Sequence, residues 1–81
     1  MSLIQEFNEY RSRTNELILS HDNLALKRFF SLDHQMYQEG ALSVQTKEML
    51  GLAASMVLRC DDCIKYHLQK CYENGVSTEM I

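Results

Sequence analysis

Cys60 and Cys63 stand three residues apart in the stretch RCDDCIKYH, and His67 follows the second cysteine by four positions. If Cys60 ends a loop and Cys63 falls in the first turn of a helix, Cys63 and His67 share one face of that helix. The N–H groups at a helix amino terminus stabilise a thiolate, and a histidine one turn further along can exchange a proton with it. This spacing predicts thiol redox chemistry. Asp61 and Asp62 oppose it, because they place negative charge beside the sulfurs.

Two other interpretations of these residues stay open. Zinc prefers such ligands, but at about 1.5 Å rise per residue Cys60 and Cys71 lie roughly 16 Å apart on one helix, whereas zinc ligands lie within about 2.3 Å of the metal. The candidate zinc ligands are Cys60, Cys63, His67 and Cys71. This spacing still allows a zinc site that uses two or three of them together with a Glu or His from another segment or subunit. Alternatively the cysteines are small hydrophobes and His67 is a core residue, which is the interpretation we favour for Cys71.

Four helices are expected to position these side chains, because apolar residues recur every three or four positions along most of the chain. The pattern predicts helices over residues 3–19, 24–39 and 44–59, and a fourth from residue 61 to the Asn74–Gly75 break. Gly40 is predicted to end the second helix in the left-handed conformation. No strand-like alternation or internal repeat is present, so the predicted fold class is all-α.

Capping residues and one glycine add detail to this prediction. Ser43 is the expected N-cap of the third helix, and Asp61 and Asp62 are expected to cap the fourth. Gly51 falls inside the third helix, where it costs about 1 kcal/mol relative to Ala, so we expect it to permit close contact with a neighbouring helix. The final residues, VSTEMI, look like the opening turn of a fifth helix, which indicates a truncated domain or a frayed end.

Composition and length restrict the class of protein. The 81 residues form one expected domain over 1–81, and a domain of this size buries only roughly 60% of its unfolded surface. The net charge is −3 and the eight Lys and Arg residues are scattered, so no nucleic-acid-binding surface is indicated. The longest nearly uncharged run, residues 49–58, is far shorter than the roughly 20 residues that cross a bilayer, and the start does not resemble a signal peptide. We therefore expect a cytoplasmic protein without a membrane partner.

Residues 42–81 carry a longer pattern: a Glu, eleven residues, a Cys, two residues, a Cys, three residues and a His, which falls on Glu48, Cys60, Cys63 and His67. With the flanking LSVQTKEML and GVSTEMI, this segment closely resembles the core of the carboxymuconolactone decarboxylase superfamily, in its alkylhydroperoxidase D-like branch. The first half of the chain resembles that family only in its general pattern. The branch is the one that carries the cysteine pair, which argues against lactone decarboxylation as the activity.

The resemblance implies an all-α, alkylhydroperoxidase D-like fold and a thiol-dependent peroxidase or disulfide oxidoreductase, assembled as a homo-oligomer, a trimer or a hexamer. Cys60 or Cys63 would attack the peroxide, the other thiol would close a disulfide, and an external dithiol would reduce it. The resemblance also implies that Glu48 and His67 form the proton relay, and it implies no metal or organic cofactor. Nothing in the spacing alone shows that Glu48 reaches the cysteines.

Two departures from the family pattern are visible. Asp62 stands where some members have a second histidine, and family domains usually continue with a further apolar helix after the turn at Gly75. The alternative hypothesis is a non-catalytic helical oligomerisation or binding module, with or without a partial zinc site.

Overall fold

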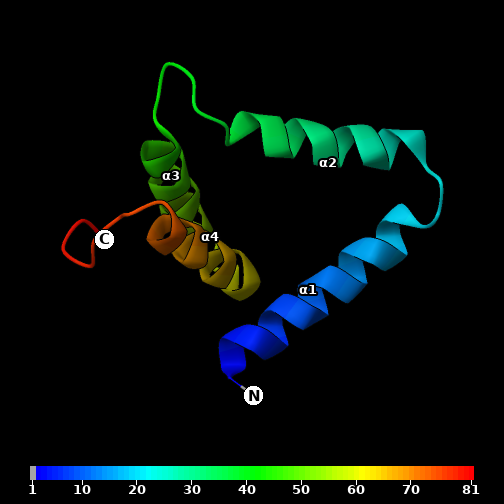
Figure 1. Cartoon of the computed structure of the whole chain (residues 1–81), viewed down its shortest axis with the longest axis horizontal. Helices are drawn as coiled ribbons and strands as arrows, with labels where there is room; N and C mark the ends of the chain where they lie inside the picture. The colour runs from blue at the N-terminus through cyan, green and yellow to red at the C-terminus, as the bar shows by residue number, and fades with distance from the viewer. Residues whose placement is uncertain (1) are drawn as a thin grey trace. The chain divides into compact units, whose positions relative to one another are not determined.

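The computed structural model describes residues 2–81 and consists of four α-helices, with no strand in that part of the chain. The helices are α1 (Leu3–Leu19), α2 (Leu24–Met36), α3 (Val44–Val57) and α4 (Asp61–Glu73), as Figure 1 shows. The prediction of an all-α fold is confirmed. The chain divides into two compact units, Met1–Gln35 and Met36–Ile81. No helix among residues 2–81 is long and apolar enough to cross a membrane.

The first unit owes its helices to local signals. α1 begins with a capping box, in which the Ser2 hydroxyl accepts from the Gln5 N–H and the Gln5 side chain accepts from the Ser2 N–H. The Asn23 side chain accepts from the Leu26 N–H at 3.1 Å and so caps α2. Neither helix contains a buried residue. Large apolar side chains are exposed along both of them: Leu3, Ile4, Tyr10, Leu17, Leu19, Leu24, Phe29, Leu32 and Met36.

The second unit is built on a hairpin of α3 and α4, which lie side by side (Figure 1). Ser43 caps α3 as predicted, because its hydroxyl accepts from the Thr46 N–H at 3.1 Å. The buried core contains Leu52, Cys71 and Val76. Three partly buried side chains, Met49, Ile64 and Leu68, pack against it. This small core holds together the two helices that carry the predicted site residues.

Three boundary predictions were wrong. α2 ends at Met36 rather than at residue 39, and Gly40 does not adopt a positive φ. The physical reason is a tertiary contact: the Lys47 ammonium of α3 donates to the Gln38 carbonyl at 2.5 Å, which holds the residues after α2 against α3. α3 ends at Val57 rather than at residue 59, because the chain enters the left-handed conformation at Arg59, with φ of 54°.

The end of α4 follows the prediction. Gly75 has φ of 81°, a conformation that favours glycine. Residues 77–81 form a turn, in which the Met80 N–H bonds the Ser77 hydroxyl at 3.3 Å, and no fifth helix is present among the described residues.

Gly75 provides a stability prediction with a matched control. In Gly75→Ala the added Cβ would lie 3.3 Å from the Gln45 amide nitrogen, which itself donates to the Asn74 carbonyl at 2.7 Å. We expect the free energy of unfolding to fall by about 1–2 kcal/mol in urea denaturation. Gly40→Ala is the control, because its Cβ would make only an ordinary contact with Lys47, so the change should stay within about 0.5 kcal/mol. Equal effects of the two substitutions would contradict this explanation.

Candidate active site

A C-capping motif ends α3 just before Cys60. The Cys60 N–H donates to the Ser55 carbonyl and the Arg59 N–H to the Met56 carbonyl, both at 3.1 Å. With Arg59 in the left-handed conformation, these two bonds form a Schellman motif, which usually has glycine at this position. The connection between α3 and α4 is therefore short and fully hydrogen-bonded, so Cys60 has a defined place at the start of α4.

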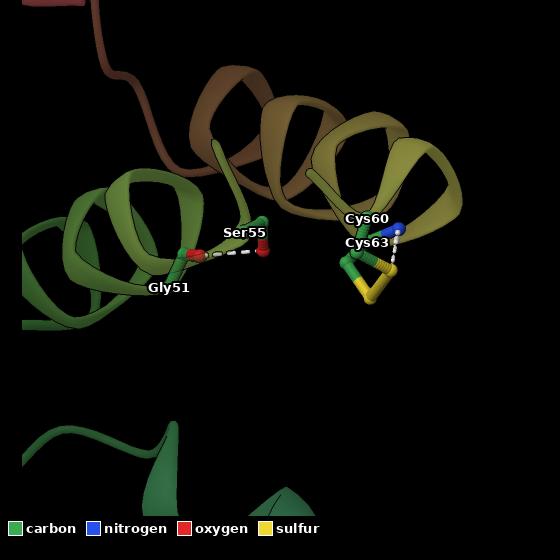
Figure 2. Close-up of a disulfide and its surroundings, with 4 residues drawn as sticks. All are labelled: Gly51, Ser55, Cys60 and Cys63. Carbon is green, nitrogen blue, oxygen red and sulfur yellow. Dashed lines mark hydrogen bonds between the residues drawn. A yellow bond between two sulfur atoms is a disulfide. The ribbon is translucent and has the colours of Figure 1, made fainter. Parts of the chain in front are cut away.

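Cys60, rather than Asp61 or Asp62, is the N-cap of α4, which corrects the predicted cap. Its sulfur accepts from the Cys63 N–H at 3.3 Å (Figure 2), so the sulfur takes the place that a hydroxyl or carboxylate oxygen usually occupies. Asp61 and Asp62 instead occupy the first two helical positions, where their negative charge favours the helix amino terminus. The predicted position of Cys63 in the first turn is confirmed.

The two cysteines are joined as a disulfide (Figure 2). Their Cα atoms are 5.2 Å apart, which lies within the usual range for a disulfide. Cys63 is exposed and Cys60 is partly buried. Thus the pair lies at the amino terminus of α4, beside Asp61 and Asp62, and a thiol reagent can reach the exposed Cys63.

Glu48 and His67 meet between the two helices. The Nδ1 atom of His67 lies 2.8 Å from Oε2 of Glu48, and the two side chains are only 13% and 4% exposed. The pairing expected from the resemblance is therefore present in the geometry, which spacing alone could not show. Because an ionised carboxylate only accepts hydrogen bonds, we infer that Nδ1 carries the proton in this contact and that Nε2 is the nitrogen left for proton exchange.

His67 also follows Cys63 by one turn of α4, so their side chains project from the same face of the helix. The Glu48–His67 pair and the Cys60–Cys63 disulfide are thus related through α4, which carries His67 one turn after Cys63. The Glu48 carboxylate orients the imidazole of His67, and the backbone positions of His67 and Cys63 are one helical turn apart. This arrangement can support proton transfer to and from a thiol.

Cys71, one further turn along α4, lies in the core and is fully buried, as expected. Burial raises the pKa of its thiol above the ordinary value of 9.0, and the negative charge of Glu48 raises it further. A thiol in this state is protonated at neutral pH and resists oxidation. The three cysteines therefore differ in environment: Cys60 and Cys63 form the disulfide at the start of α4, whereas Cys71 is buried in the core.

The raised pKa of Cys71 predicts a dependence of stability on pH in the oxidised protein. Below pH 9 both folded and unfolded chains keep this thiol protonated, so it has no effect. Above pH 9 the unfolded chain loses the proton and the folded chain keeps it, so the free energy of unfolding falls, by at most about 1.4 kcal/mol per pH unit. Cys71→Ala should remove this component of the slope while lowering stability at neutral pH by about 1 kcal/mol. Equal slopes between pH 9 and 10.5 in urea denaturation would contradict the assignment.

The described residues do not form a cluster of zinc ligands. Within residues 2–81, no group of three or more His, Cys, Asp or Glu side chains is placed to hold a metal ion. Cys60 and Cys63, two of the four candidate ligands, are bonded to each other.

Sequence reasoning missed two side chains that lie close to the site. Ser55 is buried on α3, and its hydroxyl donates to the Gly51 carbonyl at 2.7 Å (Figure 2). Tyr37 places its ring beside His67, with ring centroids 5.2 Å apart. Gly51 was the one available signal, because a glycine within a helix indicates a close approach, although it does not say which side chain approaches.

A sequence model of the carboxymuconolactone decarboxylase family matches residues 23–81, which is the greater part of the chain and extends well before the segment 42–81. A protein of Paracoccus denitrificans, described as uncharacterized protein 4 in the cox locus, is 30% identical over 53 residues, or 65% of this chain and 48% of that protein. The chain therefore spans about half the length of this relative.

Two crystal structures of the TM1620 protein of Thermotoga maritima resemble the chain. The first is 53% identical with a TM-score of 0.91, and the match covers 94% of this chain and 67% of that one. The second is described as a carboxymuconolactone decarboxylase family protein with a possible involvement in antioxidative response; it is 53% identical with a TM-score of 0.85, over 91% of this chain and 62% of that one. The similarity thus includes α1 and α2, which the sequence pattern had placed outside the specific resemblance.

Proposed function

The chain belongs to the carboxymuconolactone decarboxylase family, and from that premise we propose that it is a thiol-dependent redox enzyme that reduces peroxides through Cys60 and Cys63. One observation carries the proposal: the surface disulfide of Cys60 and Cys63 begins the helix that also presents His67 to the buried carboxylate of Glu48. The antioxidative role suggested for the Thermotoga protein supports the same direction. The related activity, reduction of small disulfides, uses the same pair of sulfurs.

In the proposed cycle, Cys63 attacks. It is the exposed cysteine and it lies one helical turn from His67, which accepts the thiol proton through Nε2. The thiolate sulfur bonds to one oxygen of the hydroperoxide, the O–O bond breaks, and the leaving alkoxide or hydroxide takes the proton back from His67. Cys63 is then a sulfenic acid, and the peroxide has been reduced by two electrons.

Cys60 resolves this intermediate. Its thiol attacks the sulfur of Cys63, the S–O bond breaks, and water leaves as the disulfide forms. An external dithiol then reduces the disulfide by attack on the exposed sulfur of Cys63, so that Cys60 leaves as the thiolate. The Cys63 N–H, which already points at the Cys60 sulfur, stabilises the negative charge of that leaving group. The sum is one hydroperoxide and one dithiol converted to an alcohol, water and a disulfide.

Glu48 acts through His67 in this scheme. Its carboxylate holds Nδ1 in the protonated form, which leaves Nε2 as the base, and it stabilises the imidazolium that forms when the thiol proton arrives. The pair is largely buried, so water weakens this electrostatic interaction less than it would at the surface.

The assembly is part of the proposal. We propose a homo-oligomer, a trimer or hexamer, in the cytoplasm, with a dithiol protein or small dithiol as reductant and no nucleic acid or membrane partner. The exposed apolar residues of α1 and α2 and the small core of the second unit support association between copies. Sedimentation at micromolar concentration measures this directly, and a monomer would contradict it.

A peroxide-consumption assay tests the activity. The chain, reduced and freed of reductant, is supplied with dithiothreitol and either hydrogen peroxide or an organic hydroperoxide. We expect consumption that saturates with peroxide and exceeds the reaction of dithiothreitol alone in proportion to protein concentration. Consumption at the background rate with both peroxides, together with stoichiometric zinc in metal analysis, would favour the non-catalytic module instead.

A further inference from the structure

Tyr37 lies beside His67 although it belongs to the irregular segment after α2. The two rings have centroids 5.2 Å apart and planes tilted by 33°, so the tyrosine covers part of one face of the imidazole. Tyr66 meets the same imidazole edge to face, again with centroids 5.2 Å apart. His67 is thus enclosed by aromatic rings as well as paired with Glu48, and aromatic contacts of this type favour particular ring orientations.

Gly51 provides the space in which these groups meet. A Cβ on this residue would lie 2.7 Å from the hydroxyl oxygen of Tyr37, and 2.8 Å and 2.9 Å from the Cε1 and Nδ1 atoms of His67. Such distances are shorter than real Cβ contacts allow. The absent side chain of Gly51 therefore lets the hydroxyl of Tyr37 and the ring of His67 approach the backbone of α3, on the side of the imidazole that faces Glu48.

A hydrogen bond joins the segment that carries Tyr37 to α3. Lys47, one residue before Glu48, donates from its ammonium group to the carbonyl of Gln38, the residue after Tyr37. A contact from the beginning of α3 thus fixes the backbone beside the tyrosine. Tyr37 and Gln38 follow directly after the last residue of α2, Met36.

We propose that Tyr37 and Gly51 are positioning residues that hold the His67 ring in the orientation in which Nδ1 binds Glu48. The ring of Tyr37 blocks one side of the imidazole and the backbone at Gly51 receives its Nδ1–Cε1 edge. A half-turn of the imidazole, which would bring a carbon to Glu48 and break the bond, then has to displace Tyr37. The hydroxyl of Tyr37 is not needed for this function. The consequence for catalysis rests on the proposed function, but the orientation of His67 does not.

The first test measures orientation without any enzyme assay. In protein labelled with ¹⁵N at histidine, the Nδ1 proton of His67 gives a signal whose exchange rate with water reports how often the bond to Glu48 opens. Tyr37→Leu should raise this exchange rate about three- to tenfold, which is the range that one aromatic ring contact supports. Tyr37→Phe should leave the rate within about twofold of the wild type. Tyr72→Leu, at an exposed tyrosine of the same unit, is the control and should change nothing.

Gly51→Ala provides an independent second variant, because alanine favours the helix and the added Cβ presses on His67 directly. Exchange of the Nδ1 proton should be faster than in Tyr37→Leu, while the helical circular dichroism signal is retained. In the peroxide assay its kcat should fall by about 10²-fold with KM nearly unchanged, because a displaced imidazole affects the chemical step.

These outcomes separate the two proposals. An inactive wild type whose Nδ1 exchange still responds to Tyr37→Leu and Gly51→Ala supports the positioning proposal and sinks the proposed function. Unchanged exchange in both variants overturns the positioning proposal, whatever the activity. Equal acceleration in Tyr37→Phe and Tyr37→Leu also overturns it, since it would assign the effect to the hydroxyl.

Discussion

Cys63→Ser is expected to reduce peroxide turnover by at least about 10³-fold, because a serine hydroxyl cannot supply the nucleophilic thiolate. Cys60→Ser is expected to behave differently. Its Cys63 remains able to attack, so in the absence of dithiothreitol one equivalent of peroxide should be consumed per chain in a single fast phase, after which the sulfenic acid has no resolving thiol and consumption stops. Stopped-flow measurement of peroxide loss, followed by trapping of the sulfenic acid with dimedone, distinguishes the two variants.

Cys71→Ala is the matched control for both. It removes the third thiol but leaves the pair at the start of α4 intact, and the wild-type Cys71 is fully buried. We expect its kcat within about threefold of the wild type, measured at a temperature where it is folded. A single-turnover burst in Cys63→Ser, with none in Cys60→Ser, would reverse the assigned order of attack; steady turnover in both variants would rule out the pair as the redox centre.

Glu48→Gln is expected to lower kcat by about 10²- to 10³-fold while KM changes little. Glutamine fits the same space and can still bond Nδ1, but it removes the charge that stabilises the imidazolium. The carboxylate is 4% exposed, so water cannot replace that charge. The disulfide of Cys60 and Cys63 should still form, because the change leaves the start of α4 untouched. Steady-state kinetics at saturating dithiothreitol measure the effect.

A double-variant comparison shows whether Glu48 acts through its partner. His67→Gln alone should cost about as much as Glu48→Gln, and the double variant should be little worse than either, because both remove the same relay. Glu73→Gln is the control: that carboxylate is exposed and pairs with Lys70 at 3.0 Å on the surface, so its loss should leave kcat unchanged. Additive losses in the double variant would mean that the two residues act separately.

Local sequence signals predicted most of the fold correctly. Ser43 and Gly75 mark helix ends through bonds and dihedral angles that involve only nearby residues, and the structure has both where expected. The placement of Cys63 and His67 on one face of α4 was equally predictable, because a spacing of four within a helix fixes the geometry. Caps and periodicity are short-range, so a single sequence contains them.

Several features that the sequence did not reveal depend on contacts between residues on different elements. The return of Glu48 to His67 joins residues 19 positions apart on two helices, and its expectation rested on the family resemblance alone. α2 ended early because Lys47 holds the carbonyl of Gln38, which no helix propensity could indicate. Tyr37 was missed for the same reason. Gly51 indicated a close approach to α3, and only the folded chain identifies the approaching groups as the Tyr37 hydroxyl and the His67 ring.

The N-cap of α4 is a different case. Asp61 and Asp62 are better capping residues than cysteine, so capping preference predicted an aspartate as the N-cap in place of Cys60. The Schellman motif at Arg59 determines which residue caps α4, because Cys60 is the residue that directly follows this motif. The same short connection puts the Cys60 sulfur against the Cys63 N–H. Local backbone geometry thus places the cysteine pair at the helix terminus.

The most direct test of the central claim is a count of thiols in the denatured chain. Fully reduced protein contains three thiols. After one equivalent of hydrogen peroxide we expect one thiol, belonging to Cys71, a mass lower by two hydrogens with a Cys60–Cys63 bridge in the peptide map, and recovery of all three thiols with dithiothreitol. Three thiols remaining, or a loss that dithiothreitol does not reverse, would contradict the assignment of Cys60 and Cys63 as a redox pair.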